Sequence, residues 1–319
     1  MEKIYLIVNP EAAGGKAKEE FSKLKEVIDE KKLDVDVFFS EYPGHSIELA
    51  RNAFNQNAMR IVSFGGDGTH NEVINGILNA AKESFKKETD NFSNEEKLRI
   101  PVLGLVSIGS GNDFRKSLKL PKDIVDAFKI AIKGVQKFID VGLFEYMDFN
   151  GEKKSRHFLN ILSGGFSGTV TVKANRSKKS VFKGLVYLGA LLNTLLFSLV
   201  PDGLLRHESH EINGKFFEFD IANGKYFGGG MLVSPFSEVD DGYLNIALFR
   251  DYKGIEVLFK LKKLFDGTII KEKKLYYEKT KEVFVQCDPP SIIEADGEVL
   301  GYTPVKAKII EKAIRVIVP

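Results

Sequence analysis

The sequence is poor in cysteine, because Cys287 is the only one among its 319 residues. A single cysteine excludes a framework of internal disulfides and suits a reducing compartment. An excess of charge is lacking as well: 46 Lys and Arg stand against 44 Asp and Glu, for a formal net charge of +2. This balance gives no overall reason to expect nucleic acid as a partner. No charged segment followed by an apolar one precedes the first predicted strand, so we expect no signal peptide and a cytoplasmic protein.

Patterns typical of metal centres and hydrolases are lacking too. The histidines show no ligand spacing, and no Ser, His and Asp triad is evident around them: His45, His70, His157, His207 and His210. What the sequence does have is length enough for two domains and a hydrophobic share of 43%, enough to bury a full core.

The most informative stretch is SFGGDGTHNE at residues 63–72, which follows a short apolar strand predicted for residues 60–64 and precedes an amphipathic helix. Its turn consists of Gly65, Gly66, Asp67, Gly68 and Thr69. Such a turn exposes backbone N–H groups to phosphate oxygens at the start of a helix, and Thr69 adds a hydroxyl donor. Asp67 would repel phosphates unless a cation lay between them, which favours a nucleoside triphosphate carried with Mg²⁺. A tight turn without a ligand is the alternative that this motif alone leaves open.

A second glycine-rich turn follows the strand predicted for residues 3–8. It begins at Asn9, contains Gly14 and ends at Lys16, where a helix starts. This is not a Walker A loop, because the leading glycine is absent and Ala17 stands where Ser or Thr would hold Mg²⁺. Lys16 either reaches a phosphate or is simply a solvated side chain.

A third such turn, SIGSGNDF at residues 107–114, follows the strand predicted for residues 101–106. Ser110 and Asn112 can bond phosphate or ribose, whereas Asp113 could equally be a helix N-cap. Strands that alternate with helices predict a parallel sheet, and ligands bind at the carboxyl ends of its strands. Three glycine-rich turns at this one edge are hard to explain as mere chain reversals.

Other elements of the first domain are predicted from local signals. A strand is expected at residues 35–39, and helices are expected at 17–31, 46–55 with Ser46 as N-cap, and 121–133 with Pro121 in the first turn. The charged interval 82–99 is interpreted as a solvated insertion or a helix extension.

From residue 136 the pattern favours alternating strands, so we place a domain boundary near residue 137. Strands are expected at 138–144, 157–162, 216–222, 243–249, 283–286 and 309–318, with a loop at 163–168. Residues 181–200 are almost wholly apolar, which favours a buried core helix over an interfacial helix or a membrane span. The basic run at 176–179 beside them would suit anionic lipid head groups, or is a solvated loop.

Two pairs of carboxylates lie in the second domain. Asp240 and Asp241 stand in a turn and could hold a hard cation, although a plain turn is the rival interpretation. Asp296 and Glu298 flank Gly297, and an Asp in this position can act as general base for a hydroxyl, oriented by its neighbour.

Taken together, these motifs resemble the diacylglycerol kinase catalytic family, above all its soluble bacterial lipid kinases, with sphingosine and ceramide kinases as relatives. The resemblance spans nearly the whole chain in order, through VNP (8–10), GGDGT (65–69), NEVING (71–76), GSGND (109–113), NG (223–224), GGGM (228–231), DDG (240–242), DGE (296–298) and TPV (303–305). GGDGT alone also occurs in NAD kinases. Ser110 replaces a usual Thr but keeps the hydroxyl, and Ser107 stands where members commonly have Pro.

The resemblance implies a Rossmann-like ATP-binding α/β domain at residues 1–137 and a mainly antiparallel β-sandwich for the lipid substrate at 138–305, with 306–319 returning to the first domain. ATP and Mg²⁺ would bind in the cleft between the domains. The nucleotide would contact Asn9, Gly14, Lys16, Gly65, Gly66, Asp67, Gly68, Thr69, Glu72, Ser110 and Asn112. Asp296 would accept the proton of a lipid hydroxyl beside Glu298, and Asp241 with Asp240 and Tyr243 would form a structural Mg²⁺ site.

The implied function is transfer of the ATP γ-phosphoryl group to a membrane lipid, with diacylglycerol as first candidate. The alternatives are a sphingoid base or another lipid, then NAD, then a sensor without catalysis. A lipid substrate implies a protein that visits the inner face of the membrane peripherally. The sequence leaves the accepted lipid and the oligomeric state open, including a homodimer.

Overall fold

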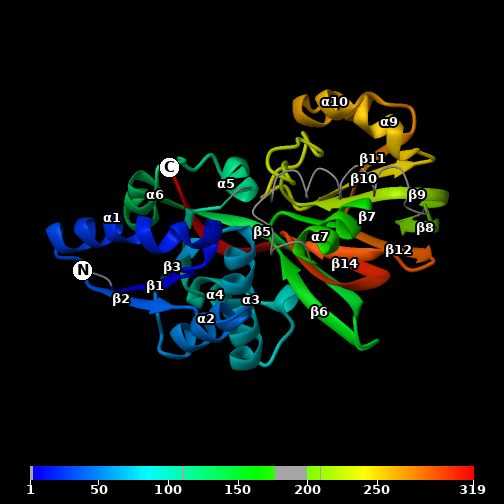
Figure 1. The fold of residues 1–319 in the computed structure, drawn as a ribbon. Coiled ribbons are helices and arrows are strands. Elements are labelled where there is room, and N and C mark those ends of the chain that lie inside the picture. The colour runs from blue at the N-terminus through cyan, green and yellow to red at the C-terminus, as the bar shows by residue number, and fades with distance from the viewer. Residues whose placement is uncertain (1–2, 110, 177–199, 209) are drawn as a thin grey trace. The chain divides into compact units, whose positions relative to one another are not determined.

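The computed structural model describes residues 3–109, 111–176, 200–208 and 210–319 (Figure 1). The chain divides into two compact units. The first unit comprises Met1–Val141, Val239–Gly242 and Ile310–Pro319, and the second comprises Gly142–Glu238 and Tyr243–Ile309. The turn Val239–Gly242 therefore belongs to the first unit, whereas the sequence analysis places it in the second domain.

The first unit is built on a parallel sheet in the order β2-β1-β3-β4-β14. Its strands are β1 (Ile4–Val8), β2 (Val35–Phe39), β3 (Arg60–Gly65), β4 (Val102–Ser107) and the last part of β14 (Glu298–Val318). Val8 pairs with Phe64 and Gly65 pairs with Ser107, so β1, β3 and β4 end level with one another. The turns that follow these strands consequently meet at one edge of the sheet.

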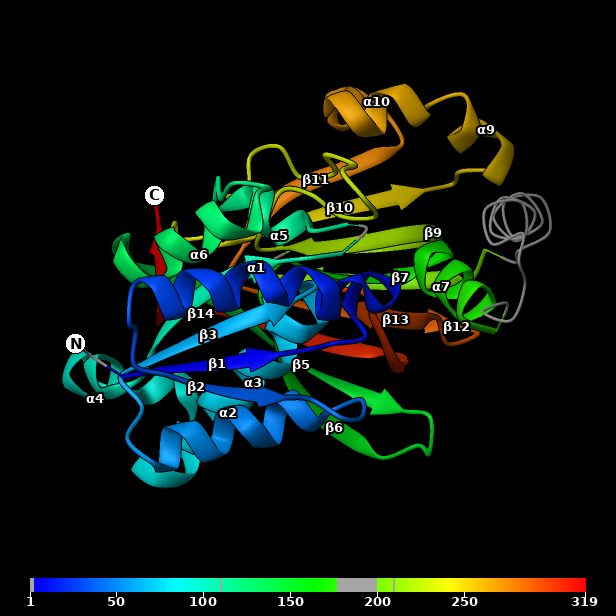
Figure 2. The ribbon, with the colours of Figure 1, turned by 60° about the vertical axis from the view of Figure 1, so that its left-hand side comes forward.

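Helices cover both faces of this sheet (Figure 2). One face carries α1 (Lys16–Glu30) and α6 (Ile124–Lys133), whose Leu24 and Phe128 share a core cluster with β1, β3 and β4. The other face carries α2 (His45–Asn55) and α3 (Asp67–Phe85), which pack against each other. Shorter elements are η1 (Ala12–Gly15), η2 (Thr89–Asn91), α4 (Asn94–Arg99) and α5 (Asp113–Ser117).

Two helix starts differ from the prediction. The N-cap of α2 is Gly44, and Ser46 lies inside the helix, because the side chain that receives the first N–H groups is Glu72 from α3. Helix α6 begins at Ile124 rather than at Pro121, because the Asp123 carboxylate accepts the backbone N–H of Asp126 and caps the helix there.

The second unit is mainly antiparallel. Its elements are β5 (Val135–Asp148, which begins in the first unit), β6 (Lys153–Phe158), β7 (Ile161–Gly165), α7 (Phe166–Arg176), β8 (Asp202–His207), β9 (His210–Ala222), β10 (Leu244–Arg250), α9 (Gly254–Leu258), α10 (Leu261–Asp266), η3 (Thr268–Lys271), β11 (Leu275–Thr280), β12 (Glu282–Asp288), β13 (Ile292–Ala295) and β14. The long strands β9 and β14 each pair with two sets of neighbours. One arm runs β9-β7-β13-β14 and the other β9-β8-β12-β14, and one apolar cluster draws side chains from both arms.

The outer face of β9, β10 and β11 carries a second apolar cluster, which takes in α9 and α10 (Figure 1). The loop predicted at residues 163–168 is wrong, because β7 continues to Gly165 and α7 starts at Phe166. The strand predicted at 157–162 is interrupted at residues 159–160. The apolar segment 181–200 lies outside the described residues except for its last position. Within the ranges that are described, no helix is both long and apolar enough to cross a bilayer.

Candidate active site

The three glycine-rich turns of the first unit are bonded to one another. The backbone N–H of Asn9 donates to the carbonyl of Phe64 at 2.9 Å, and its side-chain Nδ2 donates to Thr69 Oγ1 at 2.9 Å. The backbone N–H of Ile108 donates to the carbonyl of Gly65 at 2.8 Å. These bonds place the turns after β1 and β4 on either side of the start of α3.

Glycine is required where these turns approach closely. A Cβ at Gly65 would lie 2.4 Å from Thr69 Oγ1, so a side chain there would displace the hydroxyl. A Cβ at Gly109 would lie 2.9 Å from Asn112 Oδ1 and 3.5 Å from the Cα of Gly66. The glycines therefore serve packing between turns as well as the exposure of N–H groups.

Gly14, Lys16 and Asn112 border this group of turns. Gly14 has φ +70°, and a Cβ there would meet nothing within 4 Å, so its backbone faces open space. Lys16 is exposed in the first turn of α1. Asn112 donates to the carbonyl of Gly109, while its buried Oδ1 finds no partner among the residues that are described. Ser110 lies outside the described residues.

Two predicted nucleotide ligands have other contacts. Asp67 accepts the backbone N–H groups of Asp113 at 2.9 Å and of Phe114 at 3.3 Å, so its carboxylate caps α5. Glu72 accepts the N–H groups of Gly44 at 2.8 Å and of Ser46 at 3.2 Å and caps α2. The structure thus gives both carboxylates a role in joining elements of the first unit, and their contact with a nucleotide stays a prediction.

Sequence reasoning missed His70. It is fully buried, with Nδ1 2.8 Å from Ser63 Oγ on β3 and Nε2 3.0 Å from Ser107 Oγ on β4. Burial lowers its pKa from 6.5 to about 3, so the imidazole is neutral and can satisfy one hydroxyl as donor and the other as acceptor. The signal in the sequence is Ser107, the position where the resembled family commonly has Pro.

Two of the predicted metal ligands contact lysine side chains. Asp240 pairs with Lys137 at 2.9 Å, and the ring of Tyr243, in the second unit, lies near the ammonium groups of Lys279 and Lys281. The described residues contain no group of three or more His, Cys, Asp and Glu placed to hold a metal ion. Metal binding by Asp241, Asp240 and Tyr243 therefore stays a prediction.

The carboxylate of Asp140, which the sequence analysis did not single out, organises the Val239–Gly242 turn. It accepts the backbone N–H of Gly242 and that of Lys312, each at 2.7 Å. The N–H of Asp140 itself donates to the carbonyl of Val239 at 2.7 Å. Three segments distant in the sequence are held by this one buried residue.

Asp296, the predicted base, lies in the turn between β13 and β14 with φ +49°. Its Oδ2 accepts the N–H of Leu159 at 2.7 Å, and its Oδ1 accepts those of Asn160 at 2.9 Å and Ile161 at 3.1 Å. These bonds fix the carboxylate beside the β6–β7 turn, whose Leu159 carbonyl also accepts from Asn223 at 2.7 Å. The motifs NG and DGE thus meet at one turn of the second unit.

Glu298, the predicted neighbour of the base, forms an ion pair with Arg156 of β6 at 2.5 Å. Both side chains are largely shielded from solvent. Glu298 therefore ties the start of β14 to β6, next to the turn that orients Asp296.

A third group of carboxylates was missed: Glu218, Asp220 and Glu294. Asp220 pairs with Ser163, and Ser163 pairs with Glu294, so the group follows adjacent strands on one face beside α7. Glu294 accepts from Thr171 at 2.7 Å and Glu218 accepts the N–H of Ser167 at 2.9 Å, whereas both oxygens of Asp220 lack a partner among the described residues. Burial, joined for Glu218 by repulsion from Asp220 and for Asp220 by repulsion from Glu294, raises the pKa of both carboxyls well above the usual range.

Comparisons with known proteins place this geometry in a family. Residues 3–144 match the diacylglycerol kinase catalytic domain, and residues 160–318 match the YegS C-terminal NAD kinase beta sandwich-like domain. The "Probable lipid kinase YegS-like" of Chromohalobacter salexigens is 29% identical over 225 residues, which cover 70% of this chain and 63%, less than two thirds, of that protein. The diacylglycerol kinase of Staphylococcus aureus strain MRSA252 is 24% identical over 314 residues, which cover 98% of this chain and 91% of that protein.

Solved structures share the fold. The crystal structure of a diacylglycerol kinase from Bacillus anthracis strain Sterne matches with a TM-score of 0.68 at 22% identity, covering 100% of this chain and 97% of that one. The two domain matches follow each other along the chain and leave few residues outside. The chain therefore belongs to the lipid kinase family that combines a diacylglycerol kinase catalytic domain with a YegS-type C-terminal domain.

Proposed function

We propose that this protein transfers the γ-phosphoryl group of ATP to the hydroxyl of a membrane lipid, with diacylglycerol as the first candidate acceptor. The observation that carries the proposal is the joining of three glycine-rich turns at one sheet edge, through the Asn9–Thr69 and Ile108–Gly65 bonds. In a chain of the lipid kinase family, this edge is the natural place for the phosphates of the donor nucleotide.

The first unit supplies donors for phosphate oxygens. The first N–H groups of α3 have no partner within the helix, and the positive end of the helix dipole favours an anion there. Thr69 Oγ1 accepts the hydrogen bond from Asn9, so its own proton remains to donate to a phosphate oxygen. The open backbone at Gly14 and the exposed Lys16 would add contacts at the phosphates.

The second unit would supply the base. In the proposed step the acceptor oxygen forms a bond to the γ-phosphorus, the bond from that phosphorus to the β,γ-bridging oxygen breaks, and the hydroxyl proton passes to Asp296. Catalysis of this kind rests on positioning and on neutralising charge. The three N–H groups that orient Asp296 would hold its carboxylate in one direction. The ATP carries its own divalent cation, and we assign no described carboxylate as a ligand of that ion.

A specific observation also favours a second acceptor class, lipids with a cationic amino group. The second unit contains a pocket of about 210 Å³ lined by Gly165, Phe166, Phe217, Ile292 and Tyr302 among others. This is below the roughly 300–1,000 Å³ of sites that enclose a whole small molecule, so it has room for a chain segment only. A Cβ at Gly165 would lie 3.3 Å from Glu218 Oε2, so one buried carboxyl group stands next to the pocket wall at Gly165.

The deciding experiment is phosphate transfer from radiolabelled ATP in mixed micelles that present diacylglycerol, a sphingoid base or no lipid, with NAD as a soluble acceptor. We expect a labelled lipid, identified by chromatography. Asp296→Asn should lower turnover by about 10²–10⁴-fold while nucleotide binding persists, because only the proton acceptor is lost. Normal turnover of that variant would exclude Asp296 as the base. Labelling of NAD alone, or ATP binding without any transfer, would overturn the lipid kinase proposal.

A further inference from the structure

Helices α9 and α10 and the short link between them carry exposed as well as buried apolar side chains. Val257 and Leu264 point into the core over β9 and β10. Four more large apolar side chains are exposed and form two pairs spaced i, i+4: Ile255 (43% exposed) with Phe259 (84%), and Leu261 (37%) with Phe265 (55%). Single exposed apolar residues are common in soluble proteins, whereas a cluster of large ones marks an interaction site.

Lysine is the other prominent residue of this segment. Residues 251–274 contain seven lysines against four acidic residues, an excess of three positive charges in a chain whose overall net charge is only +2. Lys262, Lys271 and Lys273 are exposed and form no ion pair with any residue that the structure describes.

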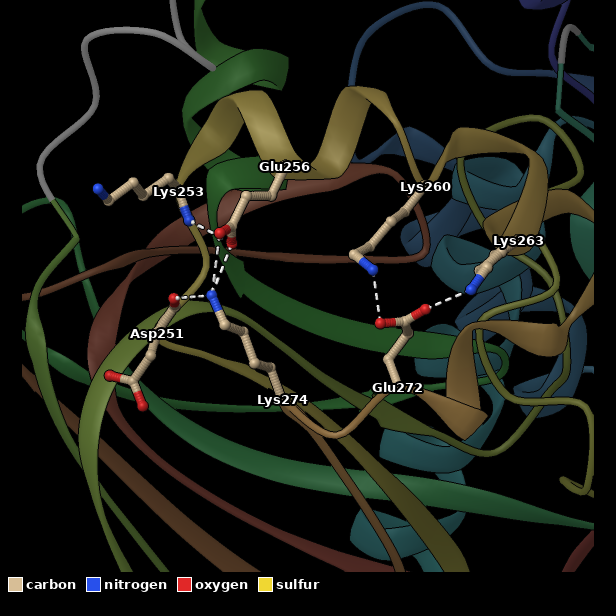
Figure 3. Close-up of polar contacts among 7 residues, drawn as sticks. All are labelled: Asp251, Lys253, Glu256, Lys260, Lys263, Glu272 and Lys274. Atoms are coloured by element: carbon tan, nitrogen blue, oxygen red, sulfur yellow. Dashed lines mark hydrogen bonds and ion pairs between the residues drawn. The ribbon is translucent and has the colours of Figure 1, made fainter.

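Two of the four acidic side chains, Glu256 and Glu272, are paired with lysines of the same segment (Figure 3). Glu272 forms ion pairs with Lys260 and Lys263, each at 2.5 Å, and Glu256 forms an ion pair with Lys274 at 2.8 Å. These lysines lower the pKa of both glutamates, so the two carboxylates stay ionised and bound. They hold α9, α10 and the start of β11 together and leave the other lysines to face solvent.

We propose that this α9–α10 surface, formed by Ile255, Phe259, Leu261 and Phe265 with Lys262, Lys271 and Lys273, docks the protein on an anionic lipid bilayer. Apolar side chains flanked by exposed ammonium groups match a layer of acyl chains beneath negatively charged head groups. A second copy of the chain fits less well, because it would bring a second excess of positive charge to the same place. The inference rests on the proposed function only in that a lipid acceptor resides in such a bilayer.

The test is flotation of the full-length protein with vesicles of phosphatidylcholine, alone or mixed with phosphatidylglycerol, at low and high salt. The wild type should bind the mixed vesicles, and salt should weaken this binding. Phe259→Ala/Phe265→Ala should lower the vesicle partition coefficient by about tenfold or more, because each ring contributes apolar burial. Lys262→Glu/Lys273→Glu should lower it by a similar factor only when phosphatidylglycerol is present.

Two matched controls test whether the loss of vesicle binding is specific to the α9–α10 surface. Phe149→Ala removes another exposed ring of the second unit, and Lys25→Glu reverses another exposed lysine. Both should bind vesicles like the wild type. Equal binding of all variants, or equal binding of the wild type to both vesicle types, would overturn the proposal. So would a wild-type dimer that Phe259→Ala/Phe265→Ala converts to monomer in sedimentation velocity, because the surface would then be a self-association interface.

Docking and catalysis can fail separately. With a short-chain, water-dispersed diacylglycerol, the surface variants should keep wild-type turnover and the wild-type melting temperature, and lose activity only on vesicles. If the wild type phosphorylates no lipid yet the variants lose vesicle binding as expected, the docking surface stands and the kinase proposal falls. Loss of activity on both substrate forms would show damage to the site and contradict a purely docking role.

Discussion

Among single residues, the two adjacent glycines before α3 differ in what a side chain would meet. A Cβ at Gly65 would collide with Thr69 at 2.4 Å, whereas one at Gly66 would lie 3.6 Å from the Ile108 carbonyl, an ordinary contact. Gly65→Ala should therefore destabilise the fold by about 1–3 kcal/mol. Gly66→Ala should leave the melting temperature unchanged but weaken ATP binding by about tenfold, because its methyl group would obstruct a phosphate.

Thermal unfolding and calorimetric ATP titration of both variants check this pair. Gly151, in the exposed β5–β6 turn, is not a suitable control. Its φ is +78°, so any side chain there would strain the backbone whether or not ATP is bound. Unchanged ATP affinity in Gly66→Ala would mean that the phosphates do not approach the start of α3.

Because Asp220 is buried, we expect its contribution to the free energy of unfolding to fall as the pH rises. Its folded pKa is raised by burial, so the stability it contributes is complete below the ordinary Asp pKa and is lost as the pH rises toward the raised value. Asp220→Asn should thus stabilise the protein at pH 8 by about 1–3 kcal/mol, and the gain should shrink toward pH 4.

Chemical unfolding at a series of pH values measures this effect. Asp36→Asn, which removes an exposed ion pair with Lys3, provides the control and should change stability little at any pH. A gain from Asp220→Asn that is the same at pH 4 and pH 8 would contradict burial of an ionisable carboxyl as the cause.

Residue roles were harder to predict than residue positions. The glycines and Thr69 could be placed at a turn from local sequence, because a strand, a glycine run and an amphipathic helix follow one another. Asp67 and Glu72 cap α5 and α2. Which free N–H groups lie near a carboxylate depends on how separate segments pack, and the order of residues in one segment does not contain that information.

At the scale of elements, His70 links α3 to the two strands beneath it through Ser63 and Ser107. Ser107→Ala would leave Nε2 of a fully buried imidazole without a partner. We expect a loss of about 1–3 kcal/mol in unfolding free energy. Ser22→Ala, on the exposed side of α1, should have almost no effect and serves as control.

The buried imidazole of His70 should also make the free energy of unfolding depend on pH. Because the folded pKa of His70 is about 3 and its ordinary value is 6.5, its contribution is complete above pH 6.5 and is lost between pH 6.5 and 3. His70→Phe should remove this part of the acid sensitivity, measured as the slope of unfolding free energy against pH. An unaltered slope would show that the imidazole is not the group that titrates.

The elements that escaped prediction have weak or misleading local sequence signals. Strands β1, β3 and β4 are continuous apolar runs buried on both faces, so their sequence signal is strong. Helices α9 and α10 carry exposed as well as buried apolar residues, which weakens the contrast between faces on which helix prediction depends. Helix α7 begins directly after Gly164 and Gly165, where the glycines suggested a loop.

For the whole molecule, the decisive feature is how often the chain passes between its two units. From the sequence we expect a boundary near residue 137 and a return at 306–319, and in the structure the first unit also includes the short turn Val239–Gly242. The amino-acid composition of this turn does not indicate that it belongs to the first unit. Its place is set by hydrogen bonds to Asp140, and these depend on residues roughly a hundred positions away in the sequence.

Asp140 therefore provides the prediction at this scale. Its carboxylate bonds Gly242 and Lys312, and its N–H bonds Val239, so three of the segments next to the crossings are joined in the first unit. Asp140→Asn exchanges one acceptor oxygen for a donor that faces a backbone N–H. We expect a loss of about 1–3 kcal/mol, together with faster hydrogen exchange at residues 239–242 and 310–314.

The control lies in the same turn. Asp240→Asn removes an ion pair with Lys137. Both side chains of this pair are more than a third exposed, so the change in stability should be less than about 1 kcal/mol. Strands β9 and β10, which belong to the second unit, should keep their exchange protection in both variants. If Asp140→Asn instead weakened protection equally throughout the chain, the two units would unfold as one cooperative body and Asp140 would not be a local joint of the first.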